Sequence, residues 1–556
     1  MSSSNKKKLR KEQYMTERQQ TAEKEAKKLK YYTLSFWVVI ALVVCIFVTA
    51  VSINPIKNVI YKNTNVVTIG DYSLSAVELN YFYVDAARNY YNNNSSYIQY
   101  LMDVNAPLNE ISAGGDLMMS DYMLDTAIDT MKSTYALYIA ALAAGHELSQ
   151  DEKSTVDYAI QLEELYAAYY YNGDTNAYLR AKYGNGASVE SYRKYCEVTI
   201  MASSYYYSYS EELRESYTAE DLLDYSAKAP YEYNSYTYTY AYLQPSTFYT
   251  AMAEDTTTAY ADLTDEQKQP YIDAAKAAAE ALAAGTYEAV KDFEDAIAAL
   301  AINNPPATTA VDATVVEPVI EMKEIKNLIY SNNTALFQNW LAGVVKGDTE
   351  NDEDTFETRT EGEVKLFEYT TTSSDKTSIN GYYVVRYGSV NENKYLAKNV
   401  HHLLVKFEKD TDEAKAAAKE EAEKLLKDWQ AGAATLESFK ELANKNSDDS
   451  GSNTNGGLYE YVYHGQMVEP FENWCYDEAR KAGDCEIIET EYGYHIMYYP
   501  EEQPTETYRD YLITNNIHAE DLIEWHEGLI EKLVLSEINS KYVLVDKSMA
   551  TLVSLY

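Results

Sequence analysis

The sequence of 556 residues has little cysteine, little histidine and none of the familiar hydrolase or nucleotide-binding motifs. Four cysteines at irregular spacing give neither a disulfide framework nor the ligand pattern of a metal site. No glycine-rich phosphate loop, no His-Glu-x-x-His and no Gly-x-Ser-x-Gly occurs. Nucleotide hydrolysis, zinc-dependent hydrolysis and the α/β-hydrolase mechanism are therefore left without a candidate site. Free buried thiols are expected, and a Cys475–Cys485 bridge stays open.

Positive charge is scarce outside the first residues. The net charge is −40, although residues 1–32 carry ten Lys and Arg against four Asp and Glu, so −46 falls on the remainder. Such an acidic body repels phosphates, which excludes a nucleic-acid partner and fits a solubility role. The 57 tyrosines against 11 phenylalanines suit wet contact surfaces. A general bias in amino-acid usage explains them equally well.

Charge is absent from Thr33 to Ile53, a run long enough to cross a bilayer as a helix. The basic residues before it place the N-terminus in the cytoplasm. We expect residues 1–32 to form a cytoplasmic tail and 33–53 an uncleaved, single-pass signal anchor in the cell membrane, with the bulk extracellular. The alternative is a cleaved signal peptide, because Val48-Thr49-Ala50 is similar to a cleavage site.

Five motifs follow one another between residues 399 and 499. An apolar strand with two histidines (400–405) precedes an alanine- and lysine-rich helix, and the polar loop 446–451 comes next. Gly456-Gly457-Leu458, the segment 465–471 and a final strand from Thr490 to Met497 complete the series. This order resembles the parvulin family of peptidyl-prolyl cis/trans isomerases over about a hundred residues.

The resemblance implies a site whose residues come from each motif. His402, His495 and Thr490 match the hydrogen-bonded set beneath the site, and Asp449 matches the central acidic or thiol group. The matches to the residues that grip proline and line the pocket are Leu458, Gln466, Met467 and Phe471. The histidines could instead be ordinary core residues, and Asp448-Asp449 a solvated turn or weak cation site. The chemistry needs no cofactor and no metal.

Two departures from the family are visible. Tyr459 replaces a glycine of the glycine-rich turn, and Gly457 stands where an acidic residue is common. The turn 406–413 is acidic, whereas phosphate-directed relatives have an arginine cluster there. Because an acidic turn repels phosphate, we expect no preference for phosphoserine-proline.

The region before this stretch is expected to be largely helical up to residue 230. Ser75 with Glu78 forms a capping box, and a helix is expected from Leu117 to Ala144, ended by Gly145. The strand–turn–helix start, this helix and the segment 188–192 resemble the chaperone module of exported foldases, including the periplasmic survival chaperone and the Gram-positive extracellular foldase.

An internal duplication is indicated between this module and the parvulin-like stretch. Gly381-Tyr382-Tyr383 lines up with Gly493-Tyr494-His495, and no histidine occurs between His146 and His401. In the strand 236–243, tyrosines at every second position share one face. We interpret residues 231–393 as a diverged parvulin copy that binds clients or acts as a spacer. An unrelated α+β domain is the alternative.

The sequence thus predicts a multidomain α+β protein. Its expected parts are the tail, a transmembrane helix, a helical chaperone module, a diverged and an intact parvulin domain, and a C-terminal helical segment: residues 1–32, 33–53, 54–230, 231–393, 394–500 and 501–556. The predicted function is an exported, membrane-anchored foldase that isomerises X–Pro bonds. Its partners would be unfolded or partly folded secreted proteins and proline-containing peptides. The alternatives are a holdase chaperone with little isomerase activity and, third, a tyrosine-rich surface or adhesion protein.

Overall fold

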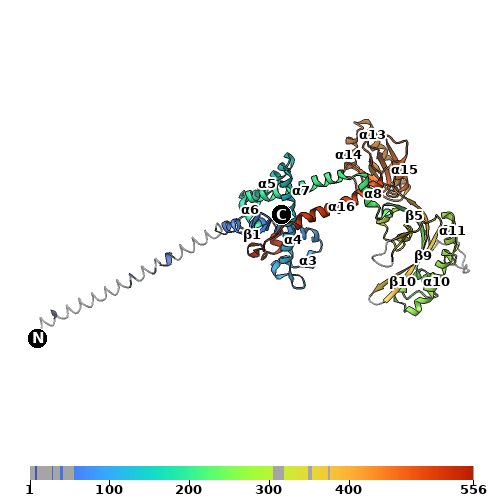
Figure 1. The fold of residues 1–556 in the computed structure, drawn as a ribbon, viewed down its shortest axis with the longest axis horizontal. Helices are drawn as coiled ribbons and strands as arrows, with labels where there is room; N and C mark the ends of the chain where they lie inside the picture. Colours follow the sequence, from blue (N-terminus) through green and yellow to red (C-terminus); the bar gives the residue numbers. More distant parts are fainter. Residues whose placement is uncertain are drawn as a thin grey trace. The chain divides into compact units, whose positions relative to one another are not determined.

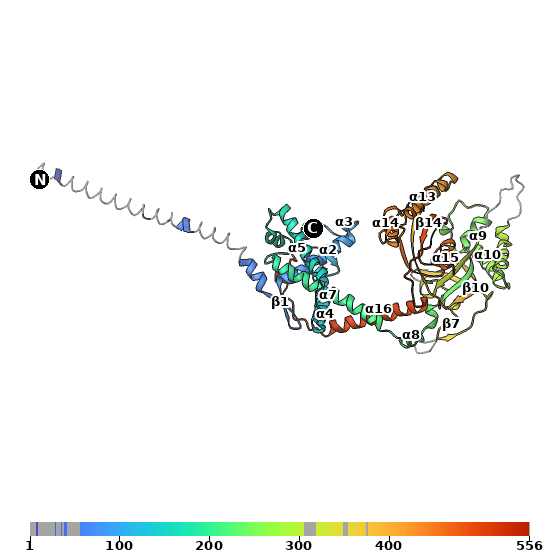
Figure 2. The same ribbon diagram turned by 90° about the horizontal axis from the view of Figure 1, so that it is seen from above.

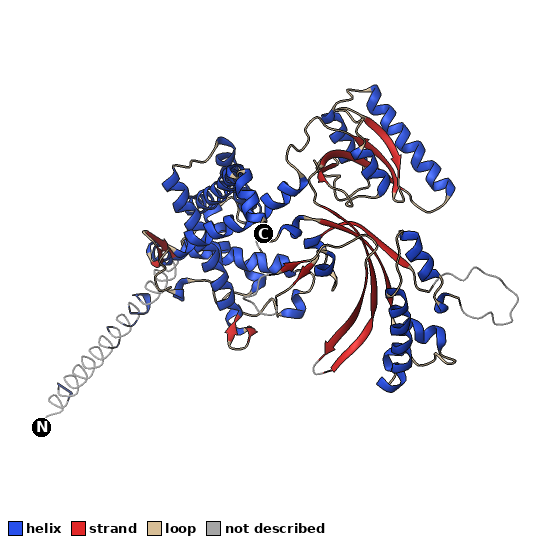
Figure 3. Ribbon diagram, turned by 45° about the vertical axis from the view of Figure 1, so that its right-hand side comes forward, coloured by secondary structure: helices blue, strands red, loops and turns tan. Residues whose placement is uncertain are grey.

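The computed structural model describes residues 56–304, 319–347, 354–373 and 376–554, and nine residues before position 42. Within these residues, no helix has both the length and the apolar character needed to cross a membrane. The expected tail 1–32 and membrane segment 33–53 lie almost entirely outside them. The chain forms two compact units, Met1–Ser216 with Ala519–Tyr556, and Tyr217–His518 (Figure 1). Figure 3 shows that the first is mainly helical and that the second contains two sheets.

The first unit is built on a bundle that follows a short hairpin. Helices α2, α4 and α7 pack against one another (Figure 2). The elements of this unit before residue 217 are β1 (Asn65–Ile69), β2 (Tyr72–Ser75), α2 (Ala76–Asn94), α3 (Ile98–Leu101), β3 (Ser112–Gly114), β4 (Leu117–Met118), α4 (Met119–Ala144), α5 (Gln150–Tyr170), α6 (Thr175–Tyr183) and α7 (Val189–Ser216).

Local signals in the sequence set the helix ends of this unit. Ser75 and Glu78 form the predicted capping box, and Ser149 with Glu152 forms a second one. Gly145 ends α4 with φ of 71°, in the left-handed region where glycine is favoured. The predicted α4 helix is therefore confirmed to within two residues at its start.

Residues 533–553 complete the first unit from far along the chain. The amide N–H of Gly70 donates to the carbonyl of Val534 (3.1 Å), and Ile69 pairs with Leu535. This segment extends the β1–β2 hairpin, and α16 (Tyr508–Glu531) ends just before it. Helix α17 (Met549–Val553) then packs on α2.

The second unit contains two antiparallel four-stranded sheets. The first sheet has the order β6-β5-β10-β9, and α10 lies against one of its faces (Figure 1). Its elements and neighbours are α8 (Ala219–Ser226), β5 (Ser235–Leu243), α9 (Pro245–Met252), α10 (Asp265–Ala283), α11 (Val290–Ala298), β6 (Met322–Ile329), α12 (Gln338–Leu341), β7 (Val344–Val345), β8 (Thr355–Phe356), β9 (Val364–Ser373) and β10 (Lys376–Asn391).

The second sheet has the order β12-β11-β14-β13. Helices α13 and α14 share one apolar cluster with the sheet and α15 shares another. The elements are β11 (Lys398–Lys406), α13 (Asp412–Ala431), α14 (Leu436–Asn446), β12 (Leu458–Val462), α15 (Glu469–Tyr476), β13 (Cys485–Glu489) and β14 (Gly493–Tyr498). Cys475 and Cys485 are free thiols, and burial raises the pKa of each to about 12.

The two sheets have the same connectivity. In each one the first and last strands are central, the second strand lies beside the first, and the third lies beside the last. Helices separate the first strand from the second in both domains, and a short helix follows the second strand. The duplication stays a prediction, and this shared order of strands supports it.

A buried ion pair between α5 and α6 gives a stability prediction for the first unit. Lys182 Nζ lies 2.8 Å from Glu163 Oε1, and both side chains are almost fully buried. Because a lone buried charge is costly, Lys182→Met is expected to lower the local unfolding free energy by about 3–5 kcal/mol. Hydrogen exchange of α5 and α6 amides measures this.

The matched control is the exposed pair Lys291–Asp295, where Lys291→Met is expected to cost less than about 1 kcal/mol. The double variant Lys182→Met/Glu163→Leu should recover most of the lost protection, because no unpaired charge remains buried. Equal losses in the single and double variants would contradict this account.

Candidate active site

Two buried histidines meet at the centre of the second sheet. His402 in β11 and His495 in β14 lie on paired strands, where Leu404 pairs with His495 and Met497 with His402. Residues two apart on a strand share a face, so both imidazoles project to the same side. Their Nδ1 atoms are 3.1 Å apart and their ring centroids 5.3 Å apart. The strand register thus forms the pair.

Thr490 and Asp449 extend this pair at either end. Thr490 Oγ1 lies 2.9 Å from His495 Nε2, and Asp449 Oδ2 lies 2.9 Å from His402 Nε2. The Asp449 carboxylate also accepts hydrogen bonds from the hydroxyls of Ser452 and Tyr459. The loop after α14 and the turn before β14 therefore supply the two ends of one hydrogen-bonded chain.

The ionised carboxylate fixes the direction of the hydrogen bond at the Asp449 end. A carboxylate only accepts hydrogen bonds, so the Nε2–H of His402 donates to Asp449. At the other end, Thr490 Oγ1 accepts the N–H of Tyr492 (3.2 Å) and lies 3.4 Å from the carbonyl of Gly493 and 2.9 Å from His495 Nε2. Between them, the two Nδ1 atoms share one hydrogen bond.

The charges of these hydrogen-bonded side chains follow from their burial and from their partners. The hydrogen bond from His402 holds the pKa of the Asp449 carboxyl well below its ordinary value. Burial, and then the neighbouring His402, lower the pKa of His495 to about 3. Burial, and then Asp449, raise the pKa of Tyr459 to about 12. At neutral pH Asp449 is therefore ionised, while His495 and Tyr459 are uncharged.

A cavity of about 370 Å³ with both apolar and polar walls opens above these groups. The ring of Phe471 lies 5.3 Å from that of His402 and 5.5 Å from that of His495, in edge-on contact with both. The cavity is lined by residues of the strands, the Asp449 loop and the α15 entry: His402, Leu404, Lys406, Asp448, Asp449, Ser450, Tyr459, Gln466, Met467, Val468, Phe471, Tyr492 and His495. A small apolar ring fits in this cavity, between Phe471 and Met467 on one side and the Asp449 carboxylate on the other.

Residues 402–501 match the family model described as "Rotamase: PPIC-type PPIASE domain". This stretch is a PPIC-type, parvulin-like domain. The chain is also 32% identical over 110 residues to foldase protein PrsA of Staphylococcus epidermidis, and 38% identical over 97 residues to that of Geobacillus kaustophilus. These alignments cover 19% and 17% of this chain, and 33% and 28% of the relatives. The chain thus spans a third or less of these curated relatives.

A solved structure of peptidylprolyl isomerase (PrsA) from Bacillus anthracis is similar at 24% identity. The likeness covers 25% of this chain and 59% of that one, with a TM-score of 0.17, too low to carry an argument.

Seven of the eight predicted site residues come together in the PPIC-type domain. Six line the cavity or its floor: His402, Asp449, Gln466, Met467, Phe471 and His495. Thr490 does not line the cavity, but its hydroxyl is hydrogen-bonded to His495 Nε2.

Leu458 does not line the cavity, and Tyr459 does. Leu458 pairs with His401 and Tyr459 with Val400 across β11 and β12. His401 is on the opposite face from His402, where its Nδ1 lies 2.8 Å from the carbonyl of Gly456. Paired residues share a face, so Tyr459 points to the cavity and Leu458 away from it.

Sequence reasoning missed Ser452, which is fully buried and bonded to Asp449. Its position three residues after an aspartate in a loop was the available signal. The neighbouring Asp448 accepts the backbone N–H of Lys406 (3.0 Å) and so ties the loop to β11. His464 pairs with Glu472 at 2.8 Å, outside the histidine chain. Within the described part of the chain, no cluster of His, Cys, Asp and Glu could hold a metal ion.

The low pKa of His495 predicts the pH dependence of stability in this domain. Unfolded histidine titrates near about 6.5, so between about 6.5 and 3 the unfolded chain takes up a proton that the folded domain does not. Stability contributed by His495 is therefore lost as the pH falls, by up to about 1.4 kcal/mol per unit. Hydrogen exchange of β11 and β14 amides at pH 5 and 7 measures it.

In His495→Gln this contribution disappears, so the difference in protection between pH 5 and 7 should shrink. Asp449, whose folded pKa is also lowered, adds a loss of the same sign below about pH 4. An unchanged pH slope in His495→Gln would show that His495 is not held neutral.

Proposed function

We propose that this chain catalyses the cis/trans isomerisation of X–Pro bonds in client proteins. The observation that carries the proposal is a cavity that places the apolar side chains of Phe471 and Met467 beside the ionised Asp449, which is hydrogen-bonded to His402. The family match of residues 402–501 supports it. As the chain covers only part of its relatives, the activity of the whole protein belongs to this proposal.

Rotation of a prolyl amide meets a barrier of about 18–20 kcal/mol, because resonance holds the C–N bond planar. That resonance form places negative charge on the carbonyl oxygen. A carboxylate near this oxygen in a low-dielectric cavity disfavours the planar form and so lowers the barrier. Phe471 and Met467 hold the proline ring, while His402, Ser452 and Tyr459 fix Asp449 in position.

The surroundings of the cavity suit an uncharged peptide. Asp448 and Asp449 both border it, and the neighbouring turn 406–413 has more acidic than basic residues. A phosphate group before the proline would meet repulsion here. The substrates are therefore neutral X–Pro segments of unfolded or partly folded proteins.

Substitutions around the cavity test the activity. Asp449→Ala is expected to lower kcat/KM in a proline-limited refolding assay by about tenfold or more, since tenfold corresponds to about 1.4 kcal/mol of barrier. Met467→Ala should raise KM, because one of the two side chains that hold the proline ring is truncated. The matched control is Asp477→Ala: Asp477 also accepts a backbone N–H, from Ala479, but it does not line the cavity, so its substitution should leave the rate unchanged.

Folding of each variant is checked by circular dichroism, since truncating buried groups costs stability. If Asp449→Ala and Met467→Ala fold and keep the full rate, the isomerase proposal fails.

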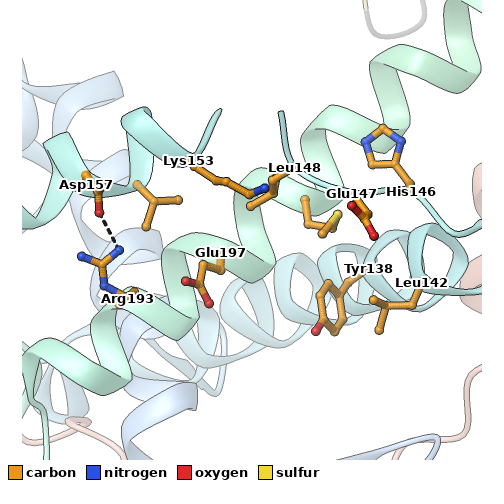
Figure 4. Close-up of a pocket in the computed structure, with 11 residues that line it drawn as sticks. Tyr138, Leu142, His146, Glu147, Leu148, Lys153, Asp157, Arg193 and Glu197 are labelled. Carbon is orange, nitrogen blue, oxygen red and sulfur yellow. Dashed lines mark hydrogen bonds and ion pairs between the residues drawn. The ribbon is translucent and has the colours of Figure 1, made fainter. Parts of the chain in front are cut away.

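A second candidate function is a holdase, favoured by a cavity of about 430 Å³ between α4, α5 and α7. Its wall includes Leu142 of α4, whose large apolar side chain is 45% exposed. Figure 4 shows Arg193 paired with Asp157 at one end and His146 at the other. Apolar side chains inside a charged rim fit an unfolded segment. In the isomerase variants, suppression of client aggregation should survive, while Leu142→Asp should weaken it.

Membrane anchoring and export form part of the proposal and rest on the sequence. The basic stretch 1–32 precedes the uncharged stretch 33–53, and the body that follows is acidic. The foldase would then act outside the cell on proteins that emerge unfolded.

Protease added to intact cells is expected to degrade the chain beyond Asn54 and to leave the basic tail intact. Lysed cells serve as the control, because the tail should then be digested as well. Recovery of a soluble form that begins at Val51 would replace the anchor with a cleaved signal.

A further inference from the structure

A second cavity, equal in size to the candidate active site, lies in the domain of residues 231–393. Its volume is about 370 Å³. Aromatic and aliphatic side chains form its walls, chiefly Tyr240, Tyr369, Tyr383, Phe337, Leu336 and Ile325. The register of the two sheets shows that this cavity occupies the same place in its domain as the active-site cavity does in the PPIC-type domain.

The last strands of the two domains give the first correspondence. Tyr383 in β10 pairs with Tyr242 in β5, as His495 in β14 pairs with Leu404 in β11. Tyr383 follows Gly381 by two positions, as His495 follows Gly493. Tyr383 therefore has the position of His495.

The first strands give the second correspondence. Tyr240 precedes the partner of Tyr383 by two residues, as His402 precedes the partner of His495. Residues two apart project to one face. The rings of Tyr240 and Tyr383 are 5.6 Å apart, against 5.3 Å for the two imidazoles. A tyrosine pair thus replaces the histidine pair.

The residues around the pair correspond as well. Tyr369 pairs with Gly381 and lies 6.2 Å from the ring of Tyr383, in the position from which Thr490 supports His495. Across the first two strands, Tyr238 pairs with Ile325 as Val400 pairs with Tyr459.

The floor of the cavity is retained. Phe337 follows the second strand of its domain, as Phe471 does in the PPIC-type domain. Its ring lies 5.6 Å from that of Tyr383, against 5.5 Å between Phe471 and His495. Both domains therefore have a phenylalanine at the floor of the cavity, whereas the imidazoles that orient a carboxylate occur in only one of them.

We propose that the cavity formed by Tyr240, Tyr383, Tyr369, Phe337 and Leu336 binds proline-containing segments in extended conformation without isomerising them. Aromatic side chains pack well against proline rings, and polyproline II segments dock in aromatic-lined grooves at low entropic cost. Tyrosine hydroxyls at the rim can donate to the backbone carbonyls that such segments leave free. The nature of the ligand, though not the cavity, rests on the proposed isomerase function.

This second site would hold a client beside the isomerase domain. A segment released from one cavity stays tethered to the chain through the other, so its local concentration at the free cavity remains high. This effect would be largest for clients with two separated prolines, because such clients can occupy both cavities at once.

Photocrosslinking of the full chain tests the proposal. The probe is an alanine–proline peptide that carries benzophenone, and crosslinked residues are mapped by mass spectrometry. Crosslinks are expected in residues 331–341 as well as 463–471, and unlabelled peptide should compete for both. The same peptide with alanine in place of proline should compete about tenfold less well.

Two exposed positions give variants that spare the core. Leu336→Asp and Tyr369→Asp, at residues 45% and 37% exposed, should each remove the crosslinks in 331–341 and leave both the refolding rate and the crosslinks in 463–471 unchanged. Met467→Asp is the reciprocal variant: it should abolish isomerase activity and keep the crosslinks in 331–341.

Each contrary result bears on one claim. Crosslinks confined to 463–471 would refute a second binding site, and equal competition by the proline-free peptide would refute its ligand. Isomerase activity that survives Met467→Asp but is lost on adding Tyr369→Asp would show that the second site is catalytic. Binding at 331–341 without any isomerase activity in the wild-type chain would overturn the proposed function and leave the second site standing.

Discussion

The hydrogen bond between the imidazoles of His402 and His495 is the interaction on which the active site depends. It can form only if β11 and β14 pair in one register, because a shift by one residue would turn one ring to the opposite face. The pair is buried, so it favours the uncharged state of His495. Sheet pairing, burial and the charge on Asp449 are thus linked through one contact.

The same contact explains the difference between the two domains of the second unit. Where the strands carry Tyr240 and Tyr383, the rings still pack and the cavity keeps its volume. Tyrosine fills the space of histidine but lacks the two ring nitrogens through which the imidazoles bond to each other and to Asp449. Substitution at two positions therefore keeps the aromatic cavity and removes the hydrogen-bonded imidazoles that orient a carboxylate.

Much of this could be predicted from the sequence because the signals are local. The capping boxes, the glycine that ends α4 and the alternation of tyrosines in β5 each depend on neighbours along the chain. The direction of Leu458 could not be predicted, because it depends on the pairing of β11 with β12, whose register shifts between Lys398 and Val400. The tyrosine cavity was missed because it depends on pairings between segments far apart in sequence. Ser452 was missed although its signal, the spacing to Asp449, is local.

The joining of residues 533–553 to the β1–β2 hairpin has a consequence for the order of folding. Asn80 in α2 is fully buried, and it bonds to the carbonyl of Tyr542 and the N–H of Leu544. During synthesis these partners appear more than four hundred residues after Asn80, when the sheets of the second unit have already emerged. The second unit can fold first, while α2 keeps unsatisfied polar groups until the far segment arrives. A chain interrupted before residue 533 would thus carry a finished isomerase domain on an unfinished helical unit.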